Sequence, residues 1–349
     1  SWIIILSIAT FTLSMCGTFL VRSGILNSVH TFANDPERGL FILIFLFVLI
    51  LLSIIIFFFY QIDEKNSQYK IYWLSKETSI LINNWFMIFF LSVVLIGTTY
   101  PIFLEVLTND KISVGPPFYQ KLLAPFLIPF LFIMALGTKL DWIKNKKIEV
   151  KLKKIVLLFL SILISFLIVR HLNTKILYLT VIISAALYLF FISIVDLKNE
   201  KLKWSQKVSH LAFSILIVSI ILNSVFSEEV SVNLKTGEEK KISNYLIKFE
   251  NISKIEIDNY TSLKAEIQVI KKNNNLKFYP ELRLYKVPET ITSEADIKTN
   301  LLNDNLVVVS YLKETDYLNI RYQKKPFMLL IWLSALMLAI GGILGLRKL

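Results

Sequence analysis

Residues 39–61 read GLFILIFLFVLILLSIIIFFFYQ, a stretch without a single charged side chain. A helix of about 20 apolar residues is long enough to cross the ~30 Å hydrocarbon core of a bilayer. This stretch therefore predicts a transmembrane helix. Further blocks of the same character follow along the chain, and we expect eight spans in all, at residues 2–21, 39–61, 80–100, 120–140, 153–170, 175–196, 206–226 and 326–346.

The composition agrees with a polytopic membrane protein. Of 349 residues, 55% are hydrophobic and 18% are charged, and the mean hydropathy is +0.60. The net charge of +12 would suit a nucleic-acid partner, but the lysines adjoin the apolar blocks, so membrane topology explains them better and we expect no nucleic acid. The single cysteine, Cys16, excludes an intramolecular disulfide and a cysteine metal site. The sequence contains no P-loop, CxxC or HExxH motif.

Lysine and arginine residues alternate between the connections. They gather at residues 65–76, 144–154, 198–207 and 347–348, and the positive-inside rule assigns these stretches to the cytoplasm. The outward connections are then 22–38, 101–119, 171–174 and 227–325. We accordingly expect a membrane domain of seven helices over 1–226, a periplasmic β-rich domain over 227–325, and a last helix with a cytoplasmic tail over 326–349.

Residues 227–325 differ in kind, because they are polar and rich in residues that favour strands. Residues 244–249 and 306–309 predict strands. Residues 272–275 predict a turn between strands at 265–270 and 276–279, and Thr236-Gly237 predicts another. We expect a compact antiparallel β-domain, for which a barrel is one option.

Histidines are the strongest lead to function in so apolar a chain. His210 lies a few residues inside the seventh span, where an ionisable group is costly unless it is paired or ligated. A neutral imidazole is a natural ligand of haem iron. A hydrogen bond to a neighbouring helix, or a side chain that reaches the interface, would explain the residue as well. Position alone leaves these alternatives open.

His30 lies in the first outward connection, next to a helical stripe of apolar residues at 25, 26, 29 and 32. We expect this connection to lie along the membrane surface. It ends with Asp35 as a cap and Pro36 in the first turn of the second span. Position alone favours an exposed interfacial histidine over a ligand. The third histidine, His171, is expected to be solvated.

Other polar residues suggest less specific roles. Arg22 and Arg38 bracket the His30 connection, and arginine suits paired contacts with carboxylates such as haem propionates. For either arginine alone, snorkelling at a helix end is the more ordinary explanation. Pro116 and Pro117, in the motif of residues 113–118, predict an extended, stiff segment. Asn83 and Asn84 are expected at helix contacts or at the interface.

Several motifs resemble one known family. Residues 17–24 (GTFLVRSG), Ser28-Val29-His30 and residues 35–39 (DPERG) closely resemble the CcmF family, the membrane haem lyase component of cytochrome c maturation. Further landmarks follow in order and cover essentially the whole chain, at residues 97–101 (GTTYP), 113–118 (SVGPPF), 280–283, 292–297, 325–327 and Trp332.

This resemblance implies a function and a set of partners. The family receives haem from a periplasmic carrier, CcmE, and promotes its thioether attachment to the CxxCH motif of apocytochrome c, together with a CcmH-type thiol-handling subunit. The implied location is the bacterial inner membrane. Family members carry two pairs of histidines, one for a haem b within the membrane and one that faces outward.

The motif matches assign roles residue by residue. His210 matches the second membrane histidine, which makes it an expected ligand of the haem b iron. His30 matches the second outward histidine, so it is the expected catalytic residue and a ligand of the incoming haem iron. Arg22 and Arg38 are expected near the propionates.

The sequence departs from the family in one large respect. The tryptophan-rich WWD segment and the first histidine of each pair precede the His30 connection in the family, and this chain contains neither. It begins at Ser1 with no charged region of a signal peptide, so we expect a truncated record or a split gene, and no activity from this chain alone. A secondary transporter with an extracytoplasmic domain is the alternative, although the sequence has neither an inverted repeat nor a charged midplane cluster. A relative dedicated to one cytochrome is a third possibility.

Overall fold

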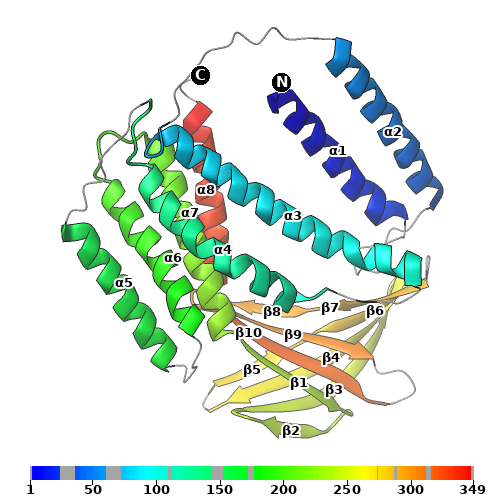
Figure 1. Cartoon of the computed structure of the whole chain (residues 1–349). Coiled ribbons are helices and arrows are strands. Elements are labelled where there is room, and N and C mark those ends of the chain that lie inside the picture. Colours follow the sequence, from blue (N-terminus) through cyan, green and yellow to red (C-terminus); the bar gives the residue numbers. More distant parts are fainter. Residues whose placement is uncertain are drawn as a thin grey trace. The chain divides into compact units, whose positions relative to one another are not determined.

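The structure is a computed structural model, and it describes residues 2–23, 36–59, 72–108, 112, 114–143, 152–171, 177–272, 274–286, 289–311 and 316–346. Eight helices lie in this part of the chain (Figure 1), each long and apolar enough to cross a membrane. They are α1 (Trp2–Ser23), α2 (Pro36–Phe59), α3 (Lys76–Thr108), α4 (Pro116–Gly137), α5 (Leu152–His171), α6 (Leu177–Asp196), α7 (Trp204–Phe226) and α8 (Met328–Leu346). The predicted fold class, eight apolar helices with one antiparallel β-domain, is confirmed.

The chain divides into two compact units, Ser1–Ile133 with Lys139–Ile148, and Met134–Thr138 with Glu149–Leu349. In the first unit, α1 meets α2 at Gly39, where an added Cβ would come within 2.9 Å of the Ser23 Cα. Likewise α3 meets α4 at Gly97, where a Cβ would lie 2.8 Å from the Tyr119 hydroxyl. At Gly39 a side chain would meet the backbone of α1 and push the two helices apart, whereas at Gly97 it would displace the Phe118 and Tyr119 rings.

The outward connection predicted at 101–119 is wrong in extent. Helix α3 continues to Thr108 with Pro101 inside it, and α4 begins at Pro116. Membrane helices tolerate an internal proline, because neighbouring groups satisfy the carbonyl that it frees. The extended segment expected at Pro116 and Pro117 is also wrong. Proline at the first helical position loses no hydrogen bond, and its fixed φ suits the helix.

In the second unit, α5 to α8 pack through small and polar residues. The Ser165 hydroxyl on α5 donates to the main-chain oxygen of Thr180 on α6 at 2.6 Å. Gly341 on α8 lies so close to Ser209 on α7 that an added Cβ would overlap it. At the other end of α7, the Asn223 side-chain amide donates to the Pro326 carbonyl at 2.5 Å. Small residues and interhelical hydrogen bonds are the usual cohesive contacts between membrane helices.

The β-domain consists of two antiparallel sheets (Figure 1). One has the strand order β1-β10-β9-β8, and the other has β2-β3-β4-β6-β7, with β5 paired to β4. The strands are β1 (Glu228–Leu234), β2 (Glu239–Ile242), β3 (Tyr245–Glu256), β4 (Tyr260–Lys271), β5 (Asn274–Phe278), β6 (Glu281–Lys286), β7 (Glu289–Glu294), β8 (Asp296–Thr299), β9 (Asn303–Tyr311) and β10 (Leu318–Pro326). Both sheets contribute to one core, in which Phe249, Ile267, Phe278, Val307 and Ile320 are almost completely buried.

The predicted turns of this domain are confirmed. Lys272, with φ of 51°, lies between β4 and β5, and Gly237, with φ of 85°, lies between β1 and β2. Both residues adopt the left-handed conformation, which is common in tight turns and easiest for glycine. The strands expected at 244–249 and 306–309 correspond to β3 and β9.

One residue joins the β-domain to the last helix. Strand β10 ends at Pro326 and α8 begins at Met328, so Phe327 alone separates them. It has a φ of 63°, its N–H donates to the Leu302 carbonyl at 2.9 Å, and its ring lies 6.4 Å from that of Phe226. A left-handed φ is costly for a bulky residue, and these contacts hold it.

Candidate functional site

His210 lies in the second turn of α7 and is half-buried. Its main-chain oxygen lies 3.5 Å from the Ser193 hydroxyl of α6, which donates to the Leu189 carbonyl of its own helix at 2.8 Å. Its chain neighbour Ser209 is the residue against which Gly341 of α8 packs. Helices α6 and α8 therefore both lie close to the turn of α7 that carries His210.

Charged residues lie one turn before His210, where α6 ends and α7 begins. Lys207 is 93% buried, and its Nζ donates to the Leu197 carbonyl at 2.9 Å and lies 4.7 Å above the Trp204 ring. Asp196 is also buried, and one of its carboxylate oxygens lies 3.5 Å from the Thr138 hydroxyl. Buried charges are costly unless they are paired, so this helix end is built around polar groups.

His171 lies elsewhere in the bundle. It ends α5 and is exposed, as expected. A 20-residue helix is about 30 Å long, and α6 leads from the end of α5 that carries His171 to the turn before α7. His171 therefore lies at the opposite end from His210. Among the residues that the structure describes, no second imidazole comes near His210.

The expected outward site is described only at its two ends, because His30 lies outside the described residues. Arg22, which is half-buried, stands in the last turn of α1, and Arg38, which is exposed, stands in the first turn of α2. Each arginine is the chain neighbour of one partner in the Gly39–Ser23 contact. The contact thus brings the main chain of the last turn of α1, with Arg22, close to that of the first turn of α2, with Arg38.

Two landmark motifs that are far apart in the sequence touch in the structure. Gly97 of the GTTYP motif packs against Phe118 and Tyr119, which follow the paired prolines.

A third landmark lies in the β-domain. Arg283 Nε donates to a Glu281 carboxylate oxygen at 3.0 Å, and the guanidinium lies 5.1 Å from the centroid of the Tyr260 ring. The described contacts of Arg283 are thus with residues of its own sheet.

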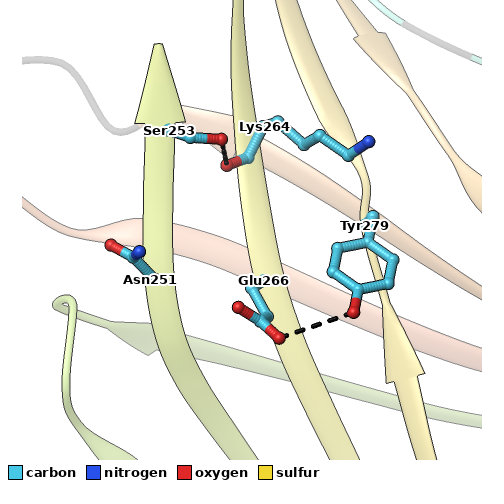
Figure 2. A pocket seen from close by; sticks show the side chains of 5 residues that line it. All are labelled: Asn251, Ser253, Lys264, Glu266 and Tyr279. Carbon is cyan, nitrogen blue, oxygen red and sulfur yellow. Dashed lines mark hydrogen bonds between the residues drawn. The ribbon is translucent and has the colours of Figure 1, made fainter.

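A hollow of about 240 Å³ lies on the surface of the β-domain (Figure 2), between β3, β4 and the residue after β5. Tyr279 donates to Glu266 at 3.5 Å, and Ser253 donates to the Lys264 carbonyl at 3.4 Å. The Glu266 carboxylate also accepts a hydrogen bond from Lys277 at 3.2 Å. The Lys264 ammonium lies 5.5 Å from the centroid of the Tyr279 ring. The hollow therefore presents a polar surface in which Glu266 is paired with Tyr279 and Lys277.

A larger hollow, of about 570 Å³, opens at the turn between α6 and α7. It contains three lysines and is bordered by the last turn of α8. The sequence pattern predicts only a basic cytoplasmic connection at residues 198–207. Trp204, placed among lysines at the first residue of a span, is the signal that could have identified it.

Comparisons with known proteins place these features in a family. Residues 225–326 match the family model described as the CcmF C-terminal beta-sandwich. The cytochrome c-type biogenesis protein CcmF of Pseudomonas aeruginosa is 31% identical, with 99% of this chain and 55% of that protein covered. CcmF of Escherichia coli is 28% identical, with the same coverage of both chains. The NrfE protein of Haemophilus influenzae is 25% identical, with 99% and 56% covered.

A solved structure has the same fold. The cytochrome c heme lyase CcmF superposes with a TM-score of 0.66 at 17% sequence identity, over 97% of this chain and 54% of that one. The chain thus spans about half the length of the relatives that it matches. The β-domain thus matches the CcmF C-terminal family model, and 99% of the chain is similar to CcmF proteins of cytochrome c biogenesis.

Proposed function

We propose that the chain forms part of a haem lyase of cytochrome c maturation, in which His210 is one axial ligand of a haem b within the membrane. The observation that carries the proposal is a half-buried histidine in a membrane-length helix, close to α6 and α8, in a chain similar to CcmF proteins. The named relatives are cytochrome c biogenesis proteins, which favours this function over a transporter.

The residues around His210 fit a role in holding haem iron. A neutral imidazole is a suitable ligand of haem iron. The described part of the chain supplies one imidazole at this depth. The second ligand would come from the segment of the family that carries the WWD motif, so this chain would not act as a lyase by itself.

The outward site is proposed for the haem that is to be attached. His30 would be the ligand of the incoming haem iron, with Arg22 and Arg38 toward the propionates. Support comes from the contact between Gly39 and Ser23, the chain neighbours of Arg38 and Arg22. The haem supplies the vinyl groups to which the CxxCH thiols add. The proposed protein partners are a CcmE-type haem carrier, apocytochrome c and a CcmH-type subunit.

We also propose the location and the sidedness. The chain would lie in a bacterial inner membrane. Residues 1–226 would form the first seven spans, and residues 227–325 a periplasmic domain. Residues 326–349 would form the last span and a short cytoplasmic tail. The alternation of basic connections supports this arrangement.

The test of the membrane site uses the complete protein or its complex. His210→Ala should lose most of the b-type haem absorbance, whereas His171→Ala, the matched control at an exposed helix end, should keep it. An unchanged spectrum in His210→Ala, at equal protein level, would exclude the residue as a ligand.

The outward site needs a different readout. His30→Ala should leave the b-type spectrum nearly intact and stop thioether attachment to a CxxCH reporter, with partial rescue by added imidazole. A normal yield of cytochrome c would contradict the assignment. Loss of both signals would show a damaged fold.

A further inference from the structure

The hollow at the turn between α6 and α7 lies where three membrane-length helices end. Helix α6 ends at Asp196, α7 begins at Trp204, and α8 ends at Leu346. All three are long and apolar enough to span a bilayer, so their common end marks a membrane–water boundary. The lining comprises Glu200, Lys201, Leu202, Lys203, Trp204, Ser205, Lys207, Leu344 and Gly345.

The charge of this lining favours an anion. Three lysines stand against one glutamate. Lys207 is 93% buried, and one hydrogen bond joins its ammonium to the Leu197 carbonyl. An ammonium group has three donors, so Lys207 keeps donor capacity beyond that bond. Lys201 and Lys203 are exposed and can move toward a ligand.

The main chain adds to the positive potential. The first turn of a helix leaves its N–H groups without partners inside the helix, and these groups with the helix dipole favour anions, phosphate above all. The first turn of α7 begins at Trp204 and forms part of the lining. The helix terminus and the lysines therefore act on the same volume.

The apolar part of the lining indicates what carries the anion. Trp204 is 65% exposed at the first residue of a span, the position in which aromatic rings meet lipid head groups. Leu344 and Gly345 belong to α8, so one wall of the hollow continues into a membrane helix. Basic pockets between membrane helices at the bilayer surface commonly bind anionic lipid head groups.

We infer that this hollow binds a phosphate group, carried by an anionic phospholipid whose acyl chains lie along the helices. The inference does not depend on the membrane haem site, because His210 does not line the hollow. Lys201, Lys203 and the first turn of α7 would contact the phosphate, and Lys207 would hold the turn in shape through Leu197.

The test titrates the purified full chain with phosphatidylglycerol and, separately, with phosphatidylcholine, and counts bound lipid by native mass spectrometry. The wild type should bind phosphatidylglycerol more tightly by on the order of tenfold. Lys201→Gln with Lys203→Gln should remove this preference. The matched control, Lys240→Gln with Lys241→Gln, changes two exposed lysines of β2 and should keep it.

Two further arms complete the test. Gly345→Glu places a negative charge in the hollow and leaves all of its lysines in place. It should also abolish the preference for phosphatidylglycerol, so the result does not depend on the lysine variant alone. The second arm adds millimolar inorganic phosphate to the complex with phosphatidylglycerol. If the phosphate displaces the lipid, the hollow is a site for a free phosphate anion and the assignment to a lipid is overturned. If the lipid stays bound, the assignment to a phospholipid is supported. Equal binding of both lipids by the wild type, or an unchanged preference in the lysine variant, would overturn the inference.

Discussion

The β-domain and the helices are held together by opposite kinds of residue. The tightest core of the β-domain consists of large side chains such as Phe249, Phe278 and Ile267. Between the helices, the closest approaches occur at glycine, as at Gly39 and Gly341. Water drives the burial of large apolar groups, whereas lipid chains are as apolar as leucine and leave close backbone packing to provide cohesion.

A comparison of two helices shows that the hydropathy of a helix does not determine how much of it is buried. Helix α2 is more apolar than α6, yet 6% of its most apolar window is buried, against 56% for α6. The buried residues of α6 include the small residues Ser184, Ala185 and Ala186 as well as large ones such as Ile183 and Leu189. The hydropathy of a membrane helix therefore does not tell how much of it is buried against its neighbours.

The largest effect is expected in the β-domain core. Phe278→Ala should lower the free energy of unfolding by about 3–5 kcal/mol, because it removes a fully buried ring and leaves a cavity. Thermal unfolding of the full chain in detergent, with hydrogen exchange to locate the change, measures this. The control Tyr311→Ala, at a ring that is 55% exposed, should cost far less. Equal losses of stability in the Phe278→Ala and Tyr311→Ala variants would show that burial of large side chains does not stabilise the β-domain.

A helix contact should respond to added volume instead. Gly341→Val should destabilise the packing of α7 on α8 by about 1–3 kcal/mol, because its side chain would overlap Ser209. The neighbouring Gly342→Val is the matched control, since nothing lies within 4 Å of a Cβ there. The measurement is the midpoint of thermal unfolding in detergent. Similar midpoints for the two variants would show that the helices are not held by close approach.

The smallest effect concerns an ion pair at the edge of the β-domain. Burial would raise the pKa of Glu228, but hydrogen bonds from Lys271 and Tyr245 outweigh it, so the pKa is lowered. A lowered native pKa stabilises the fold above the pKa of the unfolded carboxyl, and this stability is lost as pH falls through the native pKa. Glu228→Gln should therefore cost about 1 kcal/mol at neutral pH, given its partial exposure.

The pH dependence of this variant is its sharper test. The stabilities of wild type and Glu228→Gln should converge as pH falls below the native pKa, when followed by unfolding of the full chain at a series of pH values. Glu229→Gln is the control on the same strand, because its contact with Arg321 is longer, at 3.5 Å, and half-exposed. A difference between wild type and Glu228→Gln that persists in acid would exclude this ion pair as its cause.

The sequence predicted those features that depend on composition and local pattern. Eight spans, the β-domain and the turn at Lys272 all follow from hydropathy and turn residues. It failed within 101–119, where α3 continues to Thr108 and the segment expected to be extended at Pro116 and Pro117 is the start of α4. Contacts such as Gly341 with Ser209 could not be predicted, because they depend on how separate helices pack.

The candidate site was likewise predictable from the sequence only in part. His210 stood out because a histidine in a span is rare, and the structure places it in α7 between two neighbouring helices. The buried position of Lys207 and the hollow beside it were not predicted. Both arise from the fold of the turn after α6, which brings the Leu197 carbonyl to a lysine ten residues later.

The joint at Phe327 is one of two very short connections between the β-domain and the helices. Strand β10 passes into α8 through Phe327, which is held by a hydrogen bond and a ring contact, and α7 passes into β1 through Ser227 alone. Because α7 and α8 also pack against each other where Gly341 meets Ser209, both ends of the β-domain are anchored in one helix pair, and that pair includes the helix that carries His210.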